Sequence, residues 1–150
     1  MLSDLLRRLS APDDDRLPEP DARLALAALL VRVARADGHY ATTEVARIDR
    51  ILMRRHGLTP DGAMSLREEA EALEAQAPDT VRFTRAIKNG VPLEERVAVI
   101  EALWSVVLVD GTRDDEEDGL LRLLANLLGI NDRDSNLARQ RAESAVRTGP

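Results

Sequence analysis

The sequence predicts an all-α domain of about seven helices packed as a compact bundle, and three observations support this. Apolar residues recur at helical spacing along almost the whole chain, and no stretch alternates apolar and polar residues as a half-buried strand would. Only three aromatic residues are present, so the core must consist of Leu, Val, Ile and Ala, which suits close-packed helices. The 150 residues, 44% hydrophobic and 32% charged, are enough for one domain with its own core.

Two segments of different composition make up the chain. Residues 1–20 are expected to form a short amphipathic N-terminal segment followed by a Pro- and acid-rich linker, "APDDDRLPEP". Residues 21–150 are expected to form the helical domain.

The first two helices of this domain end at glycines. Residues 21–36 are apolar on nearly every side, which predicts a helix in a central position. Gly38 follows its end, as glycine commonly does at a helix C-terminus. Residues 42–56 carry Val and Ile at helical spacing, and Gly57 ends this second helix.

Capping residues delimit the next two helices. Thr59 is an N-cap for a helix over residues 60–76. Asp79 is a cap for a short helix over residues 80–88, and Asn89-Gly90 is expected to turn the chain after it.

Three helices complete the domain. An apolar helix is expected over residues 92–109, and a leucine-rich helix over residues 115–128 ends at Gly129. The last helix, over residues 132–147, begins after Asn131.

The domain contains an internal repeat with a period of 73 residues. "LALAALLVRVARADG" (24–38) aligns with "VAVIEALWSVVLVDG" (97–111), and "TEVARIDRILMRR" (43–55) aligns with "EEDGLLRLLANLL" (116–128). Two amphipathic three-helix units bury their apolar sides by facing each other. The repeat therefore predicts a pseudo-twofold duplication of a three-helix unit, with the helices over 21–36 and 92–109 as the shared centre.

Each half contains the pattern Asp-Gly, five residues, then Glu. The repeat pairs Asp37 with Asp110 and Glu44 with Glu117. One interpretation is helix capping: Asp114 is placed as an N-cap with Glu117 three residues later, an acidic form of the capping box. The first half fits this interpretation less well, because Ala41 stands at the capping position.

The second interpretation is a metal site. A turn followed by a helix start brings an Asp and a Glu seven residues apart close together, and Ca²⁺ and Mg²⁺ are bound by several such oxygen ligands. In the first half His39 lies beside Asp37 and Glu44, and this combination favours zinc or a transition metal. The spacing is not that of an EF-hand loop, because Gly follows Asp immediately.

Composition excludes several classes of function. The net charge is −6 and the sequence has no dense basic cluster, so nucleic-acid binding is not expected. The arginines, scattered among acids, are interpreted as solvated, salt-bridged surface. The absence of cysteine excludes disulfides, a thiol nucleophile and a thiolate zinc site. "MLSDLLRRLS" is too short and too charged for a signal peptide, and no apolar run reaches the roughly 18 residues of a membrane span, so a cytoplasmic location is expected.

The motifs "RADGHYATTE", "LVDGTRDDEE", "HGLTPD" and "LGINDRD" resemble the tellurite-resistance TerB family over about residues 22–148. The resemblance implies an all-helical, internally duplicated cytoplasmic domain linked to bacterial stress or metal-oxyanion resistance. It also implies a metal site formed, by position, by Asp37 and Glu44 in the first half and Asp110 and Glu117 in the second. Asp114 matches a commonly acidic cap position, whereas Ala41 departs from that pattern.

Two functions therefore remain open. In the first, a non-enzymatic protein binds a divalent cation (Ca²⁺, Mg²⁺ or Zn²⁺) at its acidic turns. In the second, the protein is an interaction module whose acids only cap helices and present a negative face to a protein partner. Under this second hypothesis the N-terminal segment docks on another subunit, which would make a homo-oligomer.

Overall fold

The fold is all-α, as predicted. The computed structural model describes residues 20–36, 38–109 and 115–148, and within these ranges it contains helices and no strand. The seven helices are α2 (Ala22–Arg35), α3 (Thr42–His56), α4 (Pro60–Gln76), α5 (Val81–Gly90), α6 (Leu93–Val107), α7 (Asp115–Leu127) and α8 (Asp132–Thr148). None of the helices in these ranges is both long enough and apolar enough to cross a bilayer.

Most helices begin and end at the residues that the sequence indicates. The Thr59 hydroxyl accepts the Gly62 N–H at 3.1 Å, and the Asn131 side chain accepts the Asp134 N–H at 2.8 Å. Gly57 and Gly129 follow α3 and α7 with φ of 63° and 79°, in the left-handed region that only glycine adopts without strain. Local capping chemistry therefore sets these four helix boundaries.

The expected turn at Asn89-Gly90 is wrong, because α5 continues through both residues. The Arg96 guanidinium, from α6, donates to the Val91 carbonyl at 2.9 Å and to the Lys88 carbonyl at 3.3 Å, and so satisfies groups at the end of α5. A Cβ atom on Gly90 would lie 3.0 Å from the Ala22 Cβ, so glycine allows α5 to pack closely against the start of α2. Contacts from distant residues override the local turn signal here.

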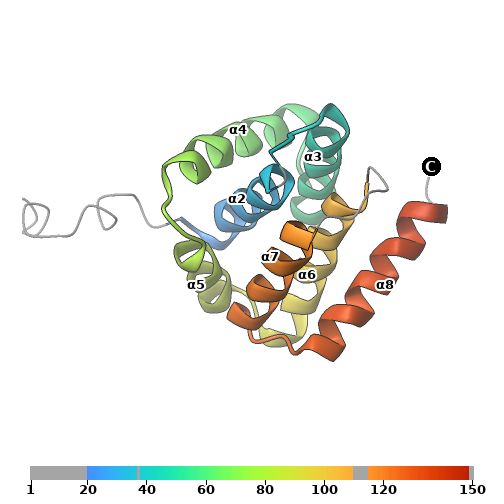
Figure 1. Cartoon of the computed structure of the whole chain (residues 1–150). Coiled ribbons are helices and arrows are strands. Elements are labelled where there is room, and N and C mark those ends of the chain that lie inside the picture. Colours follow the sequence, from blue (N-terminus) through green and yellow to red (C-terminus); the bar gives the residue numbers. More distant parts are fainter. Residues whose placement is uncertain (1–19, 37, 110–114, 149–150) are drawn as a thin grey trace, which may run out of the picture.

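α2 and α6 lie at the centre of the bundle. α2 packs against α3, α4, α5, α6 and α7, and α6 packs against α8 as well as its other neighbours. Figure 1 shows α4 and α5 on one side of the molecule and α8 on the opposite side. Nearly every residue of α2 from Ala25 to Ala34 is buried, in agreement with its apolar surface. The duplication of a three-helix unit stays a prediction.

The two predicted acidic turns connect the ends of these central helices to their following helices. The first turn leads from the end of α2 into α3, and the second leads from the end of α6 into α7. Each glutamate therefore lies in the first turn of the helix that follows a central helix in the chain.

Candidate functional site

The structure describes two of the five predicted ligands. Glu44 lies in the first turn of α3, and Glu117 is the third residue of α7. Asp37, Asp110 and Asp114 lie outside the described residues. The geometry of the site is therefore built from its two glutamates and from the helix ends that flank each turn.

Glu44 is almost completely buried, with 2% of its surface exposed. Its Oε1 accepts the backbone N–H of Ala41 at 2.9 Å, so the carboxylate points back across the start of α3. This contact is one half of a capping box; the other half is missing because the Ala41 side chain has no acceptor. Gly38, with φ of 85°, lets the chain reverse between α2 and α3.

Glu117 is buried to nearly the same degree, with 4% of its surface exposed. Like Glu44 in α3, it is the third residue of its helix. Glutamate is rarely buried to this degree unless a partner compensates the lost hydration. The sequence predicts the spacing of the two glutamates, but the structure adds their common burial.

The described residues alone do not complete a metal site. Within residues 20–36, 38–109 and 115–148, no three His, Asp or Glu side chains are grouped closely enough to hold an ion. His39 is solvent-exposed. Each glutamate would therefore supply only part of a ligand set.

An ion-pair network joins the first turn to α4. Glu74 accepts Arg32 Nε at 3.1 Å and Arg35 Nη1 at 2.7 Å, and the Arg35 guanidinium lies 5.0 Å from the centre of the Tyr40 ring. The Tyr40 hydroxyl donates to Glu71 Oε2 at 2.6 Å. Burial, followed by this hydrogen bond to a carboxylate, raises the pKa of Tyr40 above its ordinary value.

A second part of the network fixes α3 to α4. Arg67 pairs with Asp49 at 2.6 Å and with Glu71 at 3.0 Å. Burial lowers the pKa of Arg67, but the hydrogen bonds to these two carboxylates outweigh it and raise the pKa overall. The expectation that the arginines are solvated surface is wrong for Arg32 and Arg67, whose side chains are only 19% and 12% exposed. The pairs Arg32–Glu74 and Arg67–Asp49 link residues far apart in sequence, so no local pattern predicts them.

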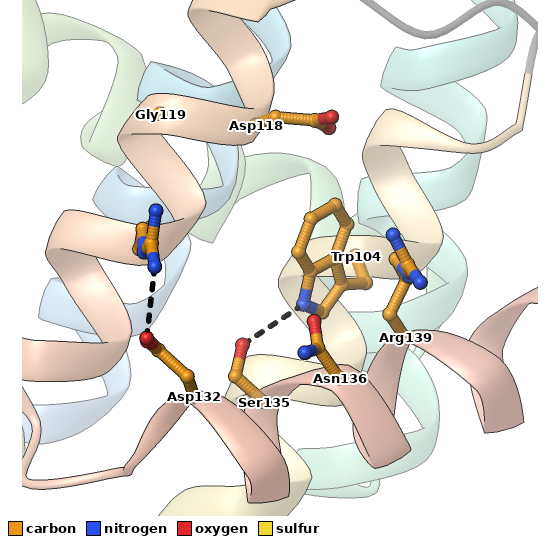
Figure 2. A pocket seen from close by; sticks show the side chains of 8 residues that line it. Trp104, Asp118, Gly119, Asp132, Ser135, Asn136 and Arg139 are labelled. Carbon is orange, nitrogen blue, oxygen red and sulfur yellow. Dashed lines mark hydrogen bonds and ion pairs between the residues drawn. The ribbon is translucent and has the colours of Figure 1, made fainter.

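A cavity of about 330 Å³ lies between α6, α7 and α8. Trp104 forms one wall and donates its indole N–H to Ser135 Oγ at 3.4 Å. Figure 2 shows Asp118 above the indole and Arg139 to its right. Arg122 and Asp132 form an exposed ion pair at 3.0 Å at its edge. Trp104 is 4% exposed, and the sequence gives no signal for this cavity.

The described residues that line the cavity do not pair a nucleophile with a histidine base. Ser135 Oγ accepts from the indole, and the residues that line the cavity include no histidine to act as its base. Oppositely charged side chains line the cavity, so it is a polar recess that does not suit an apolar ligand.

A family comparison covers most of the domain. The family model described as "Tellurite resistance protein TerB" matches residues 23–140, a span that includes all five predicted acids. No curated protein and no solved structure gave a match.

Proposed function

The chain belongs to the TerB family of tellurite resistance proteins, and from this membership we propose that it is a non-enzymatic cytoplasmic domain associated with tellurite resistance and bacterial stress. We further propose that its acidic inter-helix turns bind a divalent cation. The observation that carries this proposal is the burial of Glu44 and Glu117, each the third residue of its helix.

The physical argument starts from the cost of burying a carboxylate. A charged group that leaves water must be compensated by hydrogen bonds or by an opposite charge. The Ala41 N–H contributes to this compensation for Glu44. Asp37 in the first turn, and Asp110 and Asp114 in the second, are the further carboxylates that would hold a cation together with these glutamates.

The ligand types favour Ca²⁺ or Mg²⁺ in the second turn. Asp110, Asp114 and Glu117 provide carboxylate oxygens, which these ions prefer. The first turn has only Asp37 and Glu44, with His39 beside them, so Zn²⁺ suits it better.

Thermal melting of the full chain during titration with Ca²⁺, Mg²⁺, Mn²⁺ and Zn²⁺ tests the proposal. An ion that binds the folded state raises the melting temperature with concentration. Glu117→Gln and Asp110→Asn should abolish the rise that Ca²⁺ or Mg²⁺ produces at the second turn. Glu94→Gln is the matched control, because it makes the same change at an exposed first-turn glutamate of α6 and should leave the rise intact. The cation proposal fails if none of the four ions shifts the wild-type melting temperature.

The alternative function, a protein-interaction module, is favoured by the contact between Glu44 and Ala41. This contact shows that a first-turn glutamate acts as a capping group in α3. If capping is the whole role of the acids, Asp114→Ala should cost about 0.5–2 kcal/mol in the presence or absence of metal. The acids would then present a negative face to a basic partner.

An enzyme that acts on a metal oxyanion is the least supported class. An acidic site repels an anionic substrate, and the chain has no cysteine for redox chemistry. A non-enzymatic role is therefore the proposal.

A further inference from the structure

A groove of about 640 Å³ runs between α3, α6 and α8. Arg47, Arg50 and Arg54 line it from α3. The part formed by α6 contains Ala98 and Ala102, and α8 contributes two further alanines. The groove therefore has one basic wall and a floor of small apolar side chains.

The three arginines form a continuous basic stripe. Their spacing of three and four residues places them on one face of α3 over roughly 10 Å of helix length, at 1.5 Å per residue. The three arginines are not consecutive in the sequence, so a search for runs of basic residues does not find them. They form a pattern only when residues 42–56 are treated as a helix. The stripe stands out because the chain as a whole carries a net charge of −6.

Among the described residues that line the groove, arginines outnumber carboxylates. Burial lowers the pKa of Arg47, and repulsion from Arg50 and Arg54 lowers it further. Within the described part of the chain, the buried Arg47 Nε has no hydrogen-bond partner. Glu101 also lines the groove, but it pairs with Arg141 at 3.0 Å. The stripe is thus a site where an anionic group would gain charge-assisted hydrogen bonds.

We propose that this groove binds an amphipathic helix of a partner protein that carries acidic residues along one flank. The small side chains of the floor let another helix approach α6 closely, and its apolar face would cover them. Acids spaced three and four residues apart on the same helix would face Arg47, Arg50 and Arg54. An inorganic anion would use the arginines but not the apolar floor, so a helix accounts for both parts of the groove.

The test uses the full chain and a synthetic 18-residue peptide. The peptide carries leucines on one helical face and three glutamates at the spacing of the arginine stripe; a sister peptide carries glutamines instead. Fluorescence anisotropy of the labelled peptide should show saturable binding that weakens as salt increases, because exposed charges are screened. The glutamine peptide should bind at least about tenfold more weakly.

Three protein variants locate the binding site. Arg50→Glu should weaken binding by about tenfold or more, whereas Arg133→Glu, the same change at an exposed residue near the start of α8, should change it less than about twofold. Ala98→Gln places a larger side chain on the exposed floor without changing the charge and should also weaken binding. Circular dichroism of each variant confirms that it is folded, and Arg54→Glu replaces Arg50→Glu if that variant is not.

Several results would overturn the proposal. The first is that the glutamate peptide shows no saturable binding. The second is that Arg50→Glu and Arg133→Glu weaken peptide binding equally. The third is that the Ala98→Gln variant binds the peptide as well as the wild type does. Pyrophosphate or a single-stranded oligonucleotide that displaces the peptide at lower concentration than unlabelled peptide does would identify a general anion site instead.

Discussion

Replacing Ala41 by aspartate should stabilise the protein. Ala41 is the N-cap of α3, with φ −75° and ψ 154°, the extended conformation that capping residues adopt. It is solvent-exposed, and its side chain makes no capping hydrogen bond. An aspartate there would accept a free N–H of the first turn and place a negative charge at the positive end of the helix dipole.

The magnitude follows from the contacts already present. A good N-cap in place of alanine is worth about 0.5–2 kcal/mol. Because Glu44 already accepts the Ala41 N–H and supplies charge to the same turn, we expect about 1 kcal/mol, in the middle of that range. For a chain of this length, 1 kcal/mol raises the melting temperature by roughly 2–4 °C.

Thermal melting with a chelator present measures this effect without any contribution from metal. Asparagine has the same shape as aspartate but no charge, so Ala41→Asn should retain most of the gain in melting temperature. Comparing the two variants separates the contribution of the capping hydrogen bond from that of the charge. Thr59→Ala removes a cap that already forms at 3.1 Å and should produce a loss of similar size at the start of α4. An unchanged or lower melting temperature for both Ala41 variants would show that the start of α3 does not require a side-chain cap.

Two further predictions concern the buried polar residues. Glu74→Gln should destabilise the fold by about 2 kcal/mol, measured by urea denaturation. This is less than the roughly 3–5 kcal/mol expected for breaking a fully buried ion pair, because Arg35 is 34% exposed. Glu69→Gln, on the exposed side of α4, is the control and should have almost no effect. Burial, and then the positive charges of Arg23 and Arg55, lower the pKa of His56 below its ordinary value of 6.5. As the pH falls, the unfolded chain therefore takes up a proton on this histidine before the folded chain does. The free energy of unfolding should consequently decrease as the pH drops below about 6.5. His56→Gln should reduce this pH dependence, and equal slopes for the variant and the wild type would contradict it.

The fold is largely predictable because its boundary signals are local. Thr59 and Asn131 cap helices with their own side chains, and Gly57 and Gly129 end helices through their own backbone conformation. Gly90 shows the limit of this reasoning. Its role depends on the distance to Ala22, and a residue 68 positions earlier is invisible to a local pattern.

The candidate site is less predictable for the same reason. The repeat identifies Glu44 and Glu117, but their burial depends on how each turn packs against the rest of the bundle. The link between Arg32 and Glu74 spans 42 residues and forms only because α4 lies alongside α2. Spacing thus predicts which residues share a turn, and tertiary packing decides which of them are buried.

The two acidic turns differ in ways that bear on the cation proposal. In the first turn Tyr40 is already fixed to α4 through Glu71, and alanine replaces the acid at the capping position. Because the first turn already has this hydrogen bond and few carboxylates, we expect a bound cation to contribute less to its stability than to that of the second turn. The second turn has the larger number of acids in sequence. If the protein binds a hard cation, Glu117→Gln should therefore reduce its affinity more than Glu44→Gln does, and the reverse order would place the main site in the first half.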